Sequence, residues 1–236
     1  MSINVLRDER PKLELLRHFD KIHVDGELTG TLDIANSSQW LRKSHLFAQY
    51  YAHRFDGYHI LSSQSRRCTE LVDILRGYND IASTTILSSL IERDYGVFQG
   101  LPKSQMVQIL QQKFPDKAWA PGQNLTAWLD QELYDDEGNL LFESTQHLKK
   151  RIFEELFYQF SRLEKEHILF VGHTGTIRAL LTSFLQTWAL ELDHYLSQRD
   201  WRAHIIYGAL QMIENGQVVA INHIPRDLAQ ILGYDF

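Results

Sequence analysis

Short apolar runs alternate along the chain with longer stretches of helical periodicity. Runs of strand length lie at 12–17, at 57–63 and at 167–172, and a fourth with an irregular end lies at 83–92. The run at 167–172 is continuously apolar and bounded by polar residues, which is typical of a central parallel strand. Helical patterns are expected over 38–55, 65–76, about 102–113, 145–165 and directly after His173.

The C-terminal part has a different pattern. Residues 203–213 and 217–224 flank Asn215-Gly216, a strong signal for a β-hairpin. Strand–helix alternation followed by a hairpin predicts an α/β fold, namely a three-layer α/β/α sandwich with a mostly parallel sheet and an antiparallel edge hairpin.

Residues 101–145 are more mixed than the rest of the chain. Besides the helix at about 102–113, they hold a Pro/Gly break at 115–122, a second short helix and a DDEGN turn at 135–139. We interpret 1–236 as a single domain with a lid-like helical insertion at about 101–145 over the active site.

Composition narrows the class of protein. The chain has 236 residues, enough for one sizeable domain, and 24 Lys plus Arg against 30 Asp plus Glu give a net charge of −6. Without a basic block, such a chain is a poor nucleic-acid binder, so an anion site must be built from a few placed arginines. Cys68 is the single cysteine, and no run is apolar enough for a signal core or a bilayer crossing. We expect a cytoplasmic protein with no membrane partner.

Three predicted strands end in residues that suit an anionic ligand. They end in Arg17-His18, in Ser62-Ser63 ahead of a helix that opens with Arg66-Arg67, and in His173-Thr174-Gly175. Each residue alone has a simpler interpretation, as a buried structural histidine or an ordinary surface arginine. Ligands bind at the carboxyl ends of open α/β sheets, and arginines and helix N-termini there suit phosphate or carboxylate oxygens. The coincidence at three strand ends favours a site.

Four segments in order carry a family resemblance. They are Leu16-Arg17-His18, Ser62 to Arg67, Glu92 to Leu101 and Val171 to Gly175. The set resembles the motifs of the histidine phosphatase superfamily, which contains the cofactor-dependent phosphoglycerate mutases and many small-molecule phosphatases. The resemblance extends from residue 12 to about 225, and its specificity comes from the ordered set, since the first motif alone is too short.

The resemblance implies roles for individual residues and no metal or other cofactor. His18 would be the nucleophile that becomes phosphorylated, and Glu92 the general acid that protonates the leaving alkoxide, although a Glu beside Arg93 and Asp94 can also be a solvated charge. The phosphate would be bound by Arg17, Arg67, His173 and Thr174. Weaker expectations of substrate contact fall on Phe19, Arg93, Tyr95 and Lys103.

Departures from the family pattern leave alternatives open. The family's glycine after the nucleophile is Phe19 here, so a bulky ring must narrow the site or turn away from it. The paired arginines with which mutases hold a substrate carboxylate are absent from Val107 to Lys113. We therefore favour a phosphatase for a small phosphorylated metabolite over a mutase-type phosphotransferase. Phe19 also keeps open a non-catalytic member that binds phosphorylated ligands. Substrate identity and oligomeric state, a homodimer included, stay open.

Overall fold

One six-stranded sheet organises the molecule, with the strand order β3-β2-β4-β1-β5-β6. The computed structural model describes residues 13–19, 27–116, 129, 131–163, 167–188, 210–214 and 217–234. The first four strands run parallel, and the last two form the antiparallel edge. Their bounds are β1 Leu13–Arg17, β2 His59–Ser63, β3 Ser83–Leu87, β4 Ile168–Gly172, β5 Leu210–Glu214 and β6 Gln217–His223. The predicted mostly parallel sheet with an antiparallel edge is confirmed.

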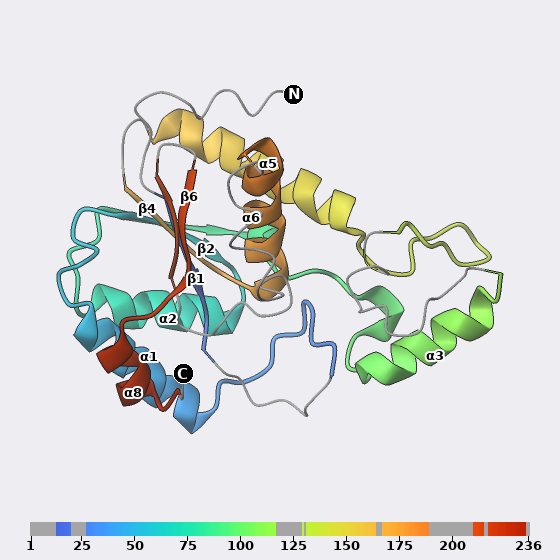
Figure 1. Cartoon of the computed structure of the whole chain (residues 1–236), viewed down its shortest axis with the longest axis horizontal. Coiled ribbons are helices and arrows are strands. Elements are labelled where there is room, and N and C mark those ends of the chain that lie inside the picture. Colours follow the sequence, from blue (N-terminus) through green and yellow to red (C-terminus); the bar gives the residue numbers. More distant parts are fainter. Residues whose placement is uncertain are drawn as a thin grey trace.

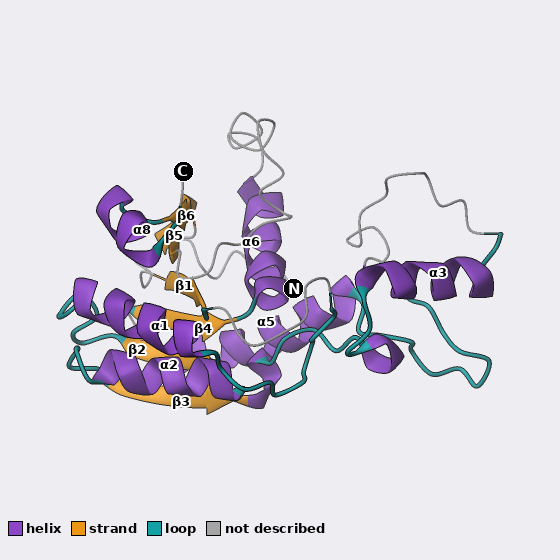
Figure 2. Ribbon diagram, turned by 90° about the horizontal axis from the view of Figure 1, so that it is seen from below, coloured by secondary structure: helices purple, strands orange, loops and turns teal. Residues whose placement is uncertain are grey.

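Helices cover both faces of the sheet (Figures 1 and 2). On one face lie α1 (Ser38–Tyr50), α2 (Arg66–Arg76) and α8 (Arg226–Leu232), and on the other lie α5 (Thr145–Arg162) and α6 (Thr174–Trp188). Each face of the sheet forms its own hydrophobic core with the helices that cover it. Successive residues of β1 point to opposite faces, so Leu16 packs with the first group of helices and Leu15 with the second. This arrangement is the predicted three-layer sandwich.

Strand β4 lies between β1 and β2, and all five of its residues are buried. A parallel strand covered on both faces has no solvent side, which explains its unbroken apolar run. The register sets Arg17 opposite Gly172, and Ser62 opposite Val171. The carboxyl ends of these three strands are therefore neighbours.

Two predicted elements are shorter than expected. The helix expected over 38–55 ends at Tyr50, and turns that include His53 with φ of 63° lead into β2. Strand β3 stops at Leu87, and the 3₁₀ turn η2 (Ser88–Leu90) follows, as the predicted irregular end required. The carbonyls of Ser89 and Ile91 accept from the Arg151 side chain rather than from a strand.

The described parts of the segment 101–145 lie beyond the carboxyl ends of the strands, to the side of the sheet (Figure 2). Its helix α3 (Lys103–Lys113) follows Pro102, and Asp135 and Asn139 close the predicted turn. The segment shares a third, smaller core with two residues from outside it. This core is formed by Leu28, Phe98, Met106, Leu110, Leu129, Leu133, Leu141 and Phe142. Most of the predicted Pro/Gly break and second short helix lies outside the described residues, as do 203–209 and the hairpin turn at 215–216. The lid function stays a prediction.

None of the helices in the described ranges has both the length and the apolar character that a bilayer crossing requires.

Candidate functional site

The two predicted site histidines lie next to each other at the carboxyl ends of the central strands β1 and β4. His18 directly follows β1, and its backbone N–H donates to the carbonyl of Gly172, the last residue of β4, at 3.2 Å. His173 follows Gly172. The two buried imidazoles lie edge to face, with ring centroids 5.2 Å apart. The predicted convergence of His18 and His173 is confirmed.

Hydrogen bonds assign the tautomer of His18. Its Nδ1 lies 2.6 Å from the carbonyl oxygen of Phe19, and a carbonyl can only accept, so Nδ1 carries the proton. Its Nε2 lies 3.2 Å from Nε of Arg67, which can only donate. The imidazole is therefore uncharged, and the lone pair of Nε2 faces the guanidinium.

Arg67 is a buried cation between the two imidazoles. Its Nε donates also to Nδ1 of His173 at 3.3 Å, and its terminal nitrogens donate to the carbonyls of Leu32 at 2.9 Å and Gly30 at 3.0 Å. Only 1% of the residue is exposed. All these partners are uncharged, and a buried charge is costly without a counter-charge. An anionic ligand would supply that counter-charge in a bidentate geometry that guanidinium favours.

Ser63 orients the second histidine. Nε2 of His173 lies 2.8 Å from Oγ of Ser63, the last residue of β2. Because Nδ1 of His173 accepts from Arg67, Nε2 carries the proton and donates. Sequence reasoning included Ser63 in a motif but gave it no role. The Cys68 thiol lies 3.6 Å from the same nitrogen, and burial raises its pKa to about 12, so it stays uncharged near neutral pH.

Arg17 and Thr174 lie at the ends of the two central strands. Arg17 is half-buried at the end of β1, opposite Gly172. Thr174 is the first residue of α6, and its hydroxyl is buried without a hydrogen-bond partner among the described residues. Because α6 starts at Thr174, its N-terminus lies directly beside His173. Helix N-termini bind anions through backbone N–H groups, so this end of α6 suits an anionic ligand.

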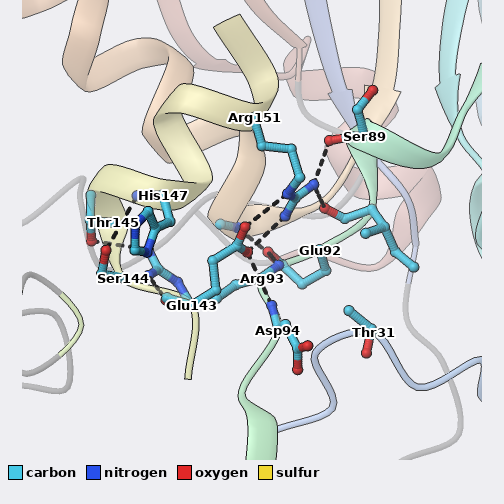
Figure 3. A network of polar contacts seen from close by, with 12 residues as sticks. Thr31, Ser89, Glu92, Arg93, Asp94, Glu143, Ser144, Thr145, His147 and Arg151 are labelled. Atoms are coloured by element: carbon cyan, nitrogen blue, oxygen red, sulfur yellow. Dashed lines mark hydrogen bonds and ion pairs between the residues drawn. The ribbon is translucent and has the colours of Figure 1, made fainter. Parts of the chain in front are cut away.

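Glu92 lies against the first turn of α6 (Figure 3). Its carboxylate accepts from the backbone N–H of Gly175 at 3.0 Å and from that of Arg93 at 2.8 Å. Through the contact with Gly175, the Glu92 carboxylate lies beside the strand-to-helix turn that carries His173. A Cβ built on Gly175 would collide with Oε1 of Glu92, so glycine permits this approach.

The Phe19 side chain turns away from the imidazoles into the core. It is completely buried and lies edge to face with Phe47 of α1, with ring centroids 5.6 Å apart. The sequence left open whether this ring narrows the site or turns away, and the structure has the second arrangement. Phe19 is therefore not placed to contact a substrate.

The other three weak candidates differ in position. Arg93 is buried, and its side chain donates to the carbonyl of Glu143 and the hydroxyl of Thr145. Tyr95 is half-buried; burial raises its pKa to about 12, and the negative charge of Glu92 adds to the effect. Lys103 is exposed at the start of α3. Tyr95 packs near Gly30, whose carbonyl accepts from Arg67.

Within the described ranges, no three His, Cys, Asp or Glu side chains are grouped so that they could hold a metal ion. The chemistry available at the strand ends is that of an uncharged imidazole, buried guanidinium, helix N-terminus and carboxylate.

Comparison with known proteins identifies a family and a shared fold. The family model described as histidine phosphatase superfamily (branch 1) matches residues 15–200. No curated protein matches the sequence significantly. Among solved structures, a mycobacterial glucosyl-3-phosphoglycerate phosphatase aligns over 86% of this chain and 90% of its own, with 20% identity and a TM-score of 0.61.

Two further solved structures share the fold. YhfR of Bacillus stearothermophilus aligns over 91% of this chain and 98% of its own, with 18% identity and a TM-score of 0.65. Phosphoserine phosphatase of Entamoeba histolytica, solved with 3-phosphoglyceric acid, gives the same coverages with 17% identity and a TM-score of 0.62. At these identities the likeness concerns the fold.

Proposed function

The chain belongs to the histidine phosphatase superfamily, and on that premise we propose that it is a phosphatase that hydrolyses a small phosphorylated metabolite through a phosphohistidine at His18. The observation that carries the proposal is the buried Arg67 guanidinium between two uncharged imidazoles. A phosphate anion bound by Arg67 lies beside Nε2 of His18. Arg67 then donates to the phosphate instead of to Nε2, which frees the lone pair of Nε2 for attack. Two structural neighbours support the substrate class, one named as a glucosyl-3-phosphoglycerate phosphatase and the other a phosphoserine phosphatase solved with 3-phosphoglyceric acid.

In the first step Nε2 of His18 attacks the phosphorus atom and the bond to the leaving oxygen breaks. The electron pair goes to that oxygen, which takes a proton from Glu92 and departs as an alcohol. Arg17, Arg67, His173 and the N-terminus of α6 stabilise the charge on the phosphoryl oxygens. The hydrogen bond from Nδ1 of His18 to the carbonyl of Phe19 keeps the attacking nitrogen unprotonated.

In the second step water attacks the phosphohistidine and the P–N bond breaks. The electron pair returns to Nε2, and the carboxylate of Glu92 takes the proton from the water. Inorganic phosphate leaves, and both side chains regain their starting protonation. The steps use residues of this chain alone.

A mutase would have to hold the substrate while phosphate returns to it. The segment Val107 to Lys113 offers no arginine for a substrate carboxylate, which favours hydrolysis. The feature that kept a non-catalytic binder open was Phe19, and its ring lies in the core, so it does not support that alternative.

Trapping the intermediate tests the proposal. The pure protein is incubated with ³²P-labelled p-nitrophenyl phosphate, quenched in base, and mapped for label on histidine. We expect base-stable, acid-labile label on His18. His18→Ala should carry no label and lose at least ~10³-fold in kcat, since it lacks the nucleophile. His45→Ala, which changes an exposed histidine on α1, is the matched control.

Three results would overturn the proposal. One is p-nitrophenyl phosphate turnover that His18→Ala leaves intact. The second is isomerisation of 3-phosphoglycerate that outpaces phosphate release, which would make the protein a mutase. The third is the absence of both label and turnover across a panel of phosphorylated metabolites, which would indicate a binding protein.

A further inference from the structure

Glu92 lies on an irregular segment that regular secondary structure does not hold. The segment runs from η2 (Ser88–Leu90) to the 3₁₀ turn η3 (Gly96–Phe98). A side chain on such a segment is held in place only if groups from elsewhere fix its backbone. Those groups come from α5 and the residues just before it (Figure 3).

Arg151, on α5, binds the segment before Glu92. Its guanidinium donates to the carbonyl of Ser89 and to that of Ile91, the latter at 3.0 Å. These two carbonyls would otherwise need other partners, since β3 has already ended. The guanidinium reaches them from the helix surface, as Figure 3 shows.

Glu143 completes an ion pair and binds the segment after Glu92. Its carboxylate accepts from Nε of Arg151 at 2.8 Å and from a terminal nitrogen of Arg151 at 2.7 Å, a bidentate geometry. It also accepts from the backbone N–H of Asp94 at 3.2 Å. The side chains are 25% and 13% exposed, so solvent screens this pair less than a surface pair.

Arg93 adds a third link in the same direction. Its side chain donates to the carbonyl of Glu143 at 2.6 Å and to Thr145 Oγ1 at 3.1 Å. Arg93 thus points toward the start of α5, while the carboxylate of the preceding Glu92 contacts Gly175 on α6.

We propose that Arg151 and Glu143 are positioning residues for the general acid, holding the backbone on both sides of Glu92 so that its carboxylate reaches the leaving oxygen. The inference rests on the proposed function. It assigns to the Arg151–Glu143 ion pair a specific contribution to protonation of the leaving group, in addition to the stability it gives.

Leaving groups of different basicity separate these two contributions. p-Nitrophenolate departs with little protonation, whereas phenolate from phenyl phosphate, a substrate of nearly the same shape, needs it more. A variant with a misplaced acid therefore loses more activity on phenyl phosphate. A variant that is merely less stable loses the same factor on both.

The experiment measures kcat/KM of both aryl phosphates for Arg151→Met, Glu92→Gln and the double variant. General acids contribute about 10²–10⁴-fold, so we expect Glu92→Gln to raise the preference for p-nitrophenyl phosphate ~10²-fold and Arg151→Met ~10-fold. The double variant should show no larger preference than Glu92→Gln, because both changes remove one function. Arg151→Lys, which keeps a donor, should restore part of the phenyl phosphate activity.

Arg54→Met is the matched control, because Arg54 forms a comparable half-buried ion pair with Glu14 of β1 at 2.8 Å. It should lower stability and leave the preference unchanged. If Arg151→Met does not fold, Glu143→Gln breaks the same pair. Equal losses on both esters with His18 still labelled would overturn this inference alone, whereas a wild-type protein without label or turnover would overturn the proposed function.

Discussion

Gly175 is in direct contact with the carboxylate of Glu92, the proposed general acid. A Cβ at this position would collide with Oε1 of Glu92, the flexible end of a side chain, and Gly175 is the second residue of α6. We predict that Gly175→Ala folds with unchanged or higher stability, since alanine favours helix by up to ~1 kcal/mol. The carboxylate must move, so activity on phenyl phosphate should fall ~10-fold more than on p-nitrophenyl phosphate.

Kinetics with the two esters and thermal unfolding check this prediction. Gly77→Ala is the matched control, because Gly77 follows α2 with φ of −71° and a Cβ there would meet only the carbonyl of Ile74 at 3.2 Å. An unchanged ester preference in Gly175→Ala would show that the Glu92 carboxylate does not act from its place beside α6.

The orientation of individual side chains was the feature of the site that the sequence predicted least well. Adjacency to His18 predicted that Phe19 affects the site, but its ring packs in the core with Phe47. Arg93 was a weak candidate for substrate contact, yet its side chain is buried and donates to the carbonyl of Glu143. In both cases the direction depends on what packs beneath the loop, which no local pattern encodes.

Among the helices, α1 and α5 begin with the same serine cap. Ser37 accepts from the backbone N–H of Trp40 at 2.9 Å, and Ser144 from that of His147 at 3.2 Å. We predict that Ser37→Ala and Ser144→Ala each lower the free energy of unfolding by about 1 kcal/mol. Only Ser144→Ala should also raise the preference for p-nitrophenyl phosphate, because Ser144 adjoins Glu143.

Denaturant unfolding and the ester pair give the two measurements. Equal ester preferences in both cap variants, at comparable losses of stability, would show that the first turn of α5 does not help position Glu92.

The strength of local signals decides which elements the sequence predicts well. The apolar run of β4 and the stripes of α2 and α3 gave boundaries within a residue or two, because burial and period agree there. The end of β3 depends on Arg151, about sixty residues later in the chain. Its guanidinium donates to the carbonyls of Ser89 and Ile91, which would otherwise be available to a longer strand. The ion pair with Glu143 has no spacing signature, so the positioning residues were not predicted.

For the whole molecule, strand order decides whether the site exists. Periodicity predicts the strands but not that β4 separates β1 from β2. The expectation that the three strand ends meet came from the unusual residues at those ends and held only if the strands were neighbours. The observed order β3-β2-β4-β1-β5-β6 brings residues 18, 63 and 173 together across most of the chain's length. A site assembled from three strand ends depends on the complete sheet, so global unfolding removes it.

Alkaline unfolding should therefore report on groups that the folded chain keeps protonated. Burial raises the pKa of Cys68 from 9.0 to about 12 and that of Tyr58 from 10.0 to about 12, while the unfolded chain ionises at the lower values. Above each lower value the unfolded state binds fewer protons than the folded state. The contribution of these two groups to stability is constant below pH 9. It falls between each lower value and about pH 12, by about 1.4 kcal/mol per pH unit for each group. Denaturant unfolding from pH 7 to 11 measures this fall, and Cys68→Ala isolates the part that comes from the thiol.

The free energy of unfolding of Cys68→Ala should differ from that of the wild type by a constant below pH 9, and the difference should shrink above pH 9. A difference that stays constant to pH 11 would show that the Cys68 thiol ionises as readily in the folded molecule as in the unfolded chain.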